Sequence, residues 1–156
     1  MDNSIKLNPE NWTYGEYIKF SGSFQGTGDS ALSYELAEKL IVAWDYEVAL
    51  EEGMYGLPSI NEANRVLRTV LDLVGAYAED IMTDNVVVDL NKWNLKRFLE
   101  FDKARSEMKV NKLEALMHEV CRLKGAKAGE PLTYPQGAMM MKAILDDYKR
   151  SLSGKN

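Results

Sequence analysis

A nine-residue segment near the N-terminus recurs 81 residues later, and this repeat limits the chain to folds with two similar halves. Trp12-Thr-Tyr-Gly-Glu-Tyr-Ile-Lys-Phe20 aligns with Trp93-Asn-Leu-Lys-Arg-Phe-Leu-Glu-Phe101. The tryptophans and the final phenylalanines coincide, and apolar residues coincide at three positions between them. We therefore expect residues 1–84 and residues 85–156 to form two tandem units related by internal duplication.

Each copy carries the same signal for the start of a helix. Thr13 and Asn94 are residue types that favour the N-cap position. In both copies a tryptophan precedes the cap and an aromatic residue occupies the fourth helical position, which is the arrangement of a hydrophobic staple. The staple pairs are Trp12 with Tyr17 and Trp93 with Phe98.

Two further helices are predicted in each half. Apolar residues recur at helical spacing before Trp44 and before Cys121. Ser59-Ile-Asn-Glu62 and Thr133-Tyr-Pro-Gln136 then read as capping boxes, each opening another helix. The prediction is an all-α protein, two three-helix units packed as one bundle. The predicted helices are 14–24, 30–46, 60–81, 95–107, 110–124 and 134–151, with loops at 47–58 and 125–132.

Each half begins with a short β-prone segment. Val86-Val87-Val88 could form a strand, and Ser4-Ile5-Lys6-Leu7 occupies the equivalent place in the first half. A lone strand needs a partner. These segments could pair with each other as a small ribbon, but we favour extended connectors.

Charge is divided unequally between the halves. Residues 1–84 carry 5 Lys/Arg and 15 Asp/Glu, a balance of −10, whereas residues 85–156 carry 14 and 9, a balance of +5. Unlike charges on the two halves favour attraction within one molecule or head to tail between molecules. We expect weak, salt-sensitive self-association in which the acidic face of residues 29–52 meets the basic face of residues 92–112.

The sequence offers no pattern typical of catalysis or cofactor binding. His118 lies three residues before the single cysteine, Cys121, on one helix face, but a metal site needs three or four ligands. The glycine-containing segment Phe24–Asp29 lacks the lysine of a phosphate-binding loop, so it is interpreted as a connector. We expect no enzyme, no metal and no cofactor, and we interpret Cys121 as a packed apolar residue.

Two groups of residues in the second half are candidates for partner binding. The basic residues Lys92, Lys96 and Arg97 begin a run of cations, which acidic residues interrupt, so nucleic-acid binding is disfavoured though kept as an alternative. Met139, Met140 and Met141 are adaptable side chains that suit either core packing or variable partners. Core packing is the more frequent role of such methionines.

The segment around Trp44 resembles the tail assembly chaperones of long-tailed bacteriophages. Those proteins are small, helical and acidic, with a tryptophan-containing helix end, a polar loop and a helix opening Pro-Ser-x-Asn-Glu-Ala. Here the corresponding stretches are Ala43-Trp44, the loop 45–57, and Pro58-Ser-Ile-Asn-Glu-Ala63. Trp12-Thr-Tyr-Gly-Glu16 is also similar to the start of many short helical phage tail proteins.

The resemblance implies a non-enzymatic chaperone that coats a helical tape measure protein before the tail tube polymerises around it. The absence of an 18-residue apolar run and of a secretory signal predicts a cytoplasmic protein, not a membrane protein. The resemblance implies that this cytoplasm is that of the host cell. The alternative is a small phage or mobile-element protein that inhibits a host factor, by protein binding or by nucleic-acid mimicry through its acidic half.

Overall fold

The computed structural model describes residues 5–24, 30–45 and 50–154, without the side chains of residues 30 and 50. The predicted connector at 25–29, the end of the predicted helix 30–46 and the start of the loop 47–58 lie outside the described residues. The described chain is mostly helical, but it also contains two small antiparallel sheets. The expectation of an all-α fold is therefore corrected to a mostly helical fold with two two-stranded sheets.

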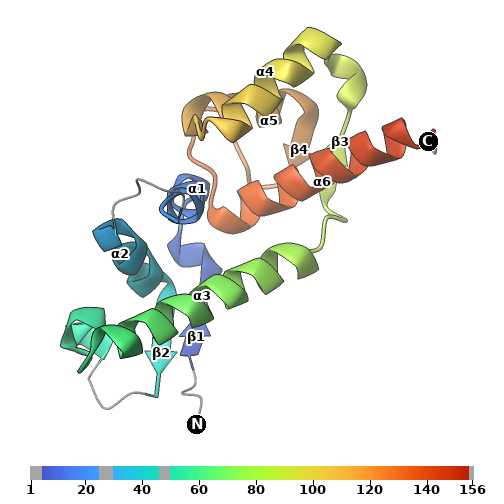
Figure 1. Cartoon of the computed structure of the whole chain (residues 1–156). Coiled ribbons are helices and arrows are strands. Elements are labelled where there is room, and N and C mark those ends of the chain that lie inside the picture. Colours follow the sequence, from blue (N-terminus) through green and yellow to red (C-terminus); the bar gives the residue numbers. More distant parts are fainter. Residues whose placement is uncertain (1–4, 25–29, 46–49, 155–156) are drawn as a thin grey trace.

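The same order of elements occurs twice along the chain (Figure 1): strand, short 3-10 helix, two α-helices, strand and long α-helix. The first half additionally has two short 3-10 helices before its long helix. Its elements are β1 (Ile5–Leu7), η1 (Pro9–Asn11), α1 (Tyr14–Gly22), α2 (Ser30–Leu40), β2 (Ile41–Trp44), η2 (Leu50–Glu52), η3 (Met54–Gly56) and α3 (Ile60–Asp80). The second half has β3 (Val86–Val88), η4 (Leu90–Lys92), α4 (Leu95–Ser106), α5 (Val110–Val120), β4 (Cys121–Leu123) and α6 (Tyr134–Leu152).

The two sheets explain where the helix predictions were too long. The segments Ile41–Trp44 and Cys121–Leu123 leave the helix and pair with β1 and β3, respectively. β-branched residues at Ile41 and Val42 suit a strand, and a paired strand satisfies the backbone groups that a frayed helix end leaves open. The favoured prediction of extended connectors for the two N-terminal segments is wrong, because both segments form strands. The alternative, a ribbon between the two segments, is also wrong, because each strand pairs within its own half.

The predicted caps open their helices. Thr13 with Glu16, and Thr133 with Gln136, form complete capping boxes in which both reciprocal hydrogen bonds are made. Asn94 accepts from the N–H of Arg97, 2.8 Å away. Each cap satisfies N–H groups that have no intrahelical partner. These contacts fix the first turns of α1, α4 and α6.

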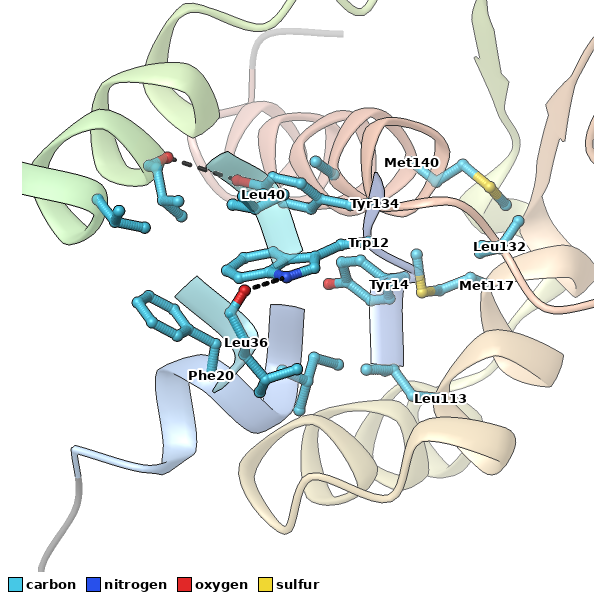
Figure 2. Close-up of a cluster of buried hydrophobic side chains, with 14 of the residues drawn as sticks. Trp12, Tyr14, Phe20, Leu36, Leu40, Leu113, Met117, Leu132, Tyr134 and Met140 are labelled. Atoms are coloured by element: carbon cyan, nitrogen blue, oxygen red, sulfur yellow. Dashed lines mark hydrogen bonds between the residues drawn. The ribbon is translucent and has the colours of Figure 1, made fainter. Parts of the chain in front are cut away.

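Trp12 lies at the centre of the first half's core. Its indole Nε1–H donates to the carbonyl of Leu36 in α2, 2.8 Å away, and its ring packs on Phe20 of α1 (Figure 2). Tyr17 contacts the same tryptophan, as the staple predicts. Trp93 of the second half packs on Phe98 and Phe101 in the same way. Each tryptophan therefore anchors a helix entry and is buried.

The two halves are joined where the first helix meets the last. Thr13 and Thr133 form an isolated antiparallel bridge. The N–H of Tyr14 donates to the carbonyl of Leu132 at 2.8 Å, and the N–H of Tyr134 donates to the carbonyl of Trp12 at 2.9 Å. Figure 2 shows Trp12, Tyr14 and Tyr134 in one cluster with side chains of both halves. A single core therefore runs through α1, α5 and α6.

Tyr14 and Gly137 set how closely α1 approaches α6. A Cβ atom placed on Gly137 would come within 3.0 Å of three side-chain atoms of Tyr14, a distance that real Cβ atoms do not tolerate. Tyr14 is buried at this contact, and burial raises the pKa of its hydroxyl. The absence of a side chain at Gly137 therefore makes room for the tyrosine ring.

Helix length and composition also bear on membranes. The longest described helix, α3, spans Ile60–Asp80 and carries charged residues along its length. Among the residues that the structure describes, no helix is both long and apolar enough to cross a bilayer.

Candidate protein-binding site

An apolar pocket lies where α2, η3 and the first turn of α3 meet. Its volume is about 230 Å³, and apolar atoms dominate its wall. The pocket is open to the surface at Tyr55 and Ile60, whose side chains are 76% and 65% exposed. The lining residues are Tyr34, Met54, Tyr55, Leu57, Ser59, Ile60 and Ala63.

Hydrogen bonds hold the pocket wall in place. The hydroxyl of Tyr34 in α2 donates to the side-chain carbonyl of Asn64 in α3, 2.5 Å away. The Glu38 carboxylate of α2 accepts from the N–H of Met54 in η3. Gly53 precedes that turn at φ 67°, a left-handed conformation that favours glycine. The pocket is therefore built by three elements tied to one another.

The pocket suits apolar side chains from a partner. Its lining residues carry no charge, and the polar groups among them are tyrosine and serine hydroxyls. Acidic residues lie nearby in sequence, at Glu51, Glu52 and Glu62. Small apolar pockets with a few polar groups at the edge are the usual form of a binding site for a hydrophobic anchor.

A second open apolar surface lies on α4. Leu95 and Leu99, one helical turn apart, are 73% and 54% exposed. Lys96 and Lys103 share this side of the helix and are also exposed. We call Leu95, Lys96, Leu99 and Lys103 the open face of α4. Scattered exposed leucines are common, but here they are grouped on one helix face.

The predicted basic residues are not equivalent in the structure. Arg97 forms ion pairs with Glu119 and Glu100, and these hydrogen bonds raise the pKa of its guanidinium. Glu119 also accepts from the indole N–H of Trp93, 3.0 Å away. Arg97 therefore supports the tryptophan that it follows. Lys92 and Lys96 are exposed.

The predicted methionine group is divided between core and surface. Met140 is fully buried, and we therefore move it from the partner-binding candidates to the core. Met141 is half-buried against the same core, and Met139 is half-buried as well. Consecutive residues of one helix point in different directions, so a run of three methionines on α6 cannot form one surface.

Trp44 ends the strand β2 and lies opposite Ile5 of β1. It is half-buried and packs against the core. Trp44 and Ile5 therefore form the terminal residue pair of the first half's sheet. The segment Pro58–Ala63, which carries the rest of the resemblance, contributes Ser59, Ile60 and Ala63 to the pocket wall.

Three titratable side chains outside the pocket have pKa values that burial shifts. Cys121 is buried, and burial raises the pKa of its thiol to about 12. The Nε2 atom of His118 is buried without a hydrogen-bond partner among the described residues, and burial lowers the pKa of this imidazole. Burial raises the pKa of the Glu114 carboxyl, which accepts from the N–H of Leu132. In the described ranges, no three His, Cys, Asp or Glu side chains converge as metal ligands.

Relatedness to known proteins gives no further guide. Searches of protein-family models, curated proteins and solved structures find no match to this chain. The pocket and the open face of α4 are therefore the features from which function is inferred.

The pocket was missed by the sequence analysis. Met54, Tyr55 and Leu57 fall in a stretch predicted as a polar loop, although three apolar residues between Gly53 and Pro58 are a signal that a loop alone does not require. Ile60 lies at the first position of α3, on the apolar side of the helix, three and seven residues before Ala63 and Leu67, yet it is 65% exposed. Helical periodicity alone therefore gave no sign that this position is at the surface.

Proposed function

We propose that this protein is a non-enzymatic tail assembly chaperone, which holds a helical, tape measure-like client in the host cytoplasm during tail assembly. The carrying observation is the apolar pocket at the start of α3, open at Tyr55 and Ile60. Amphipathic helices bind such grooves by apolar anchors spaced three or four residues apart. The resemblance of Ala43–Ala63 to tail chaperones supports the same role.

Charge around the pocket gives the proposed client a further property. Glu51 and Glu52 directly precede the pocket residues of η3, and both are exposed. Exposed charges contribute more to association rate and orientation than to affinity. We therefore expect a client segment with apolar anchors and neighbouring Lys or Arg residues, bound more weakly at high salt.

We also infer that the two halves arose by duplication. The order strand, 3-10 helix, two helices, strand and long helix is common to both. Trp12 and Trp93 are both buried at the entries of α1 and α4, as are Phe20 and Phe101 within them.

Co-expression with a tape measure protein encoded by the same genome tests the proposal. The chaperone should raise the soluble fraction of that protein and co-purify with it. Ile60→Asp places a charge at the pocket mouth and should lower co-purification at least tenfold. Met82→Asp is the matched control, because Met82 is 68% exposed but does not line the pocket. Equal co-purification by both variants would place the client elsewhere.

The same experiment separates the proposal from the main alternative. A client that stays insoluble with or without the wild-type protein would refute the chaperone function. An inhibitor of a single host factor, acting through the acidic half, would then be the better hypothesis. Its partner would be captured by the acidic residues even in the Ile60→Asp variant.

A further inference from the structure

We propose that copies of this chain associate head to tail, the open face of α4 in one copy seating on the pocket end of α3 in the next. This inference does not depend on the proposed function, but both use the same pocket, so α4 of a second copy and a client helix would compete for it. The model for the contact is the interface between α1 and α6 within one chain. Each of its two surfaces has an uncovered counterpart.

The first counterpart pair is α1 and α4. In the alignment of the two copies, Tyr14, Gly15, Ile18 and Gly22 of α1 correspond to the open face of α4. The α1 positions are covered: a Cβ atom at Gly15 would lie 3.2 Å from Val110 of α5, and Tyr14 contacts Gly137 of α6. The α4 positions are exposed. Apart from this stripe, the apolar positions match, with Phe20 and Phe101 both buried.

The second counterpart pair is α6 and α3. Aligned on their caps, Tyr134 corresponds to Ile60 and Ala138 to Asn64. Tyr134 and Ala138 are buried, and α1 packs against this end of α6. Ile60 and Asn64 are exposed. These two positions at the start of α3 are therefore open and adjoin the pocket, whereas Ala63, the counterpart of Gly137, is buried in the pocket wall.

The residue pair at the proposed contact between copies has a total side-chain volume similar to that of the pair within the chain. Within the chain, the large ring of Tyr14 requires the absence of a side chain at Gly137. In the second pair the smaller Leu95 replaces the tyrosine, and Ala63 replaces the glycine. A smaller residue facing a larger one keeps the total volume similar, which is the substitution that packed contacts tolerate best.

The backbone at the junction also has a counterpart. The bridge between Thr13 and Thr133 would become a bridge between Asn94 of one copy and Ser59 of the next. The N–H groups of Leu95 and Ile60 would then donate across it. Within the part of the chain that the structure describes, neither N–H group has an acceptor.

The residue before each cap fits the same arrangement. Leu132 uses its carbonyl for the bridge, and its N–H donates to Glu114 of α5. Pro58 takes its place in the first half and has a carbonyl but no N–H. When α2 and α5 are aligned on their last residues, Leu40 and Val120, Tyr34 of α2 corresponds to Glu114 of α5. The start of α3 therefore keeps the carbonyl of Pro58, which can accept a hydrogen bond from an incoming helix. It lacks the N–H group that would have no acceptor there.

Charge favours a contact between unlike ends. Lys96 and Lys103 lie on the open face of α4, and no carboxylate of the described residues is within ion-pair distance of either. Glu51 and Glu52 are exposed beside the pocket. Because the two surfaces differ, each copy offers one of each, and the contact propagates into a ring or an open row.

Sedimentation of the wild-type protein at low and high ionic strength provides the first test. We expect the average mass to rise with concentration at low salt and to fall when salt screens the charges. Leu95→Asp and Ile60→Asp should each weaken association at least tenfold, whereas Met82→Asp should not. Since all three residues are exposed, circular dichroism should show the same folded content as wild type.

Mixing the two interface variants gives the decisive result. Leu95→Asp keeps an intact pocket, and Ile60→Asp keeps an intact α4, so an equimolar mixture should form dimers although each variant alone is monomeric. A symmetric dimer formed by α4 against α4 would give no such rescue. A cysteine pair, Ser59→Cys in one copy and Asn94→Cys in the other, in a Cys121→Ser background, should cross-link only in the mixture.

The outcomes separate this inference from the proposed function. Leu95→Asp should still co-purify with the tape measure client, because its pocket is unchanged, while Ile60→Asp should lose both activities. A strict monomer at high concentration and low salt, or a mixture that stays monomeric, would overturn head-to-tail association. Client binding by such a monomer would leave the proposed function intact.

Discussion

Gly137→Ala tests the closest contact between the two halves. Alanine has a higher helix propensity than glycine by about 1 kcal/mol. At Gly137, however, the new Cβ would lie within 3.0 Å of three side-chain atoms of Tyr14. Overpacking of a buried contact costs about 1–3 kcal/mol, and the buried tyrosine has little room to move. We expect a net loss of about 0–2 kcal/mol from these two effects.

Gly75→Ala is the matched control. Gly75 lies in the interior of α3, and a Cβ atom there meets no other atom within 4 Å. This variant should gain about 0.5–1 kcal/mol. Urea denaturation of both variants measures the difference, and the melting temperature should change by about 2–4 °C for each kcal/mol.

A double variant completes the test. Tyr14→Leu combined with Gly137→Ala reproduces the residue pair Leu95 and Ala63 of the proposed contact between copies. The two changes should be less damaging together than their sum, with a coupling of about 1 kcal/mol or more. If Gly137→Ala is as stable as Gly75→Ala, Tyr14 does not pack on Gly137, and the model for the head-to-tail contact loses its basis.

Three further predictions concern buried side chains. Trp93→Ala should cost about 3–5 kcal/mol in urea denaturation, while Leu95→Ala on the exposed face of α4, the helix that follows Trp93, should change stability by less than about 0.5 kcal/mol. Glu114→Gln should stabilise the protein at pH 7. Burial raises the folded-state pKa of the Glu114 carboxyl, so the wild-type protein loses stability as the pH rises above the ordinary pKa of a glutamate. The free energies of unfolding of wild type and variant should therefore converge at lower pH. Cys121→Ser should show only a modest loss of stability, and chelators should leave the melting temperature of the wild-type protein unchanged.

Local signals in the sequence located the helix starts well. The caps Thr13, Asn94, Ser59 and Thr133 each precede the helix that they predict. Such signals depend on a few neighbouring residues and on hydrogen bonds that form inside one turn. The staple pairs are also in contact, because both partners lie within one helix entry.

Features that depend on distant residues were not predicted. The strands β2 and β4 complete helical patterns in the sequence, and only pairing with β1 and β3 converts them to strands. Met140 and Arg97 belong to runs of similar residues, yet one is buried and the other is paired with Glu119. The apolar residues around Tyr55 are visible in the sequence, but only the placement of α2, η3 and α3 makes a pocket of them. Tertiary contacts decided each of these outcomes.

The bridge between Thr13 and Thr133 also has a consequence for how the protein is made. Its two residues are 120 positions apart. At a translation rate of roughly 5–20 residues per second, the ribosome needs about 6–24 s to add the second residue after the first. During that interval Tyr14 has no α6 to cover it, and contacts between distant residues form late in folding. A nascent chain that stalls before residue 133 would therefore expose the apolar side of α1 to holdase chaperones and proteases.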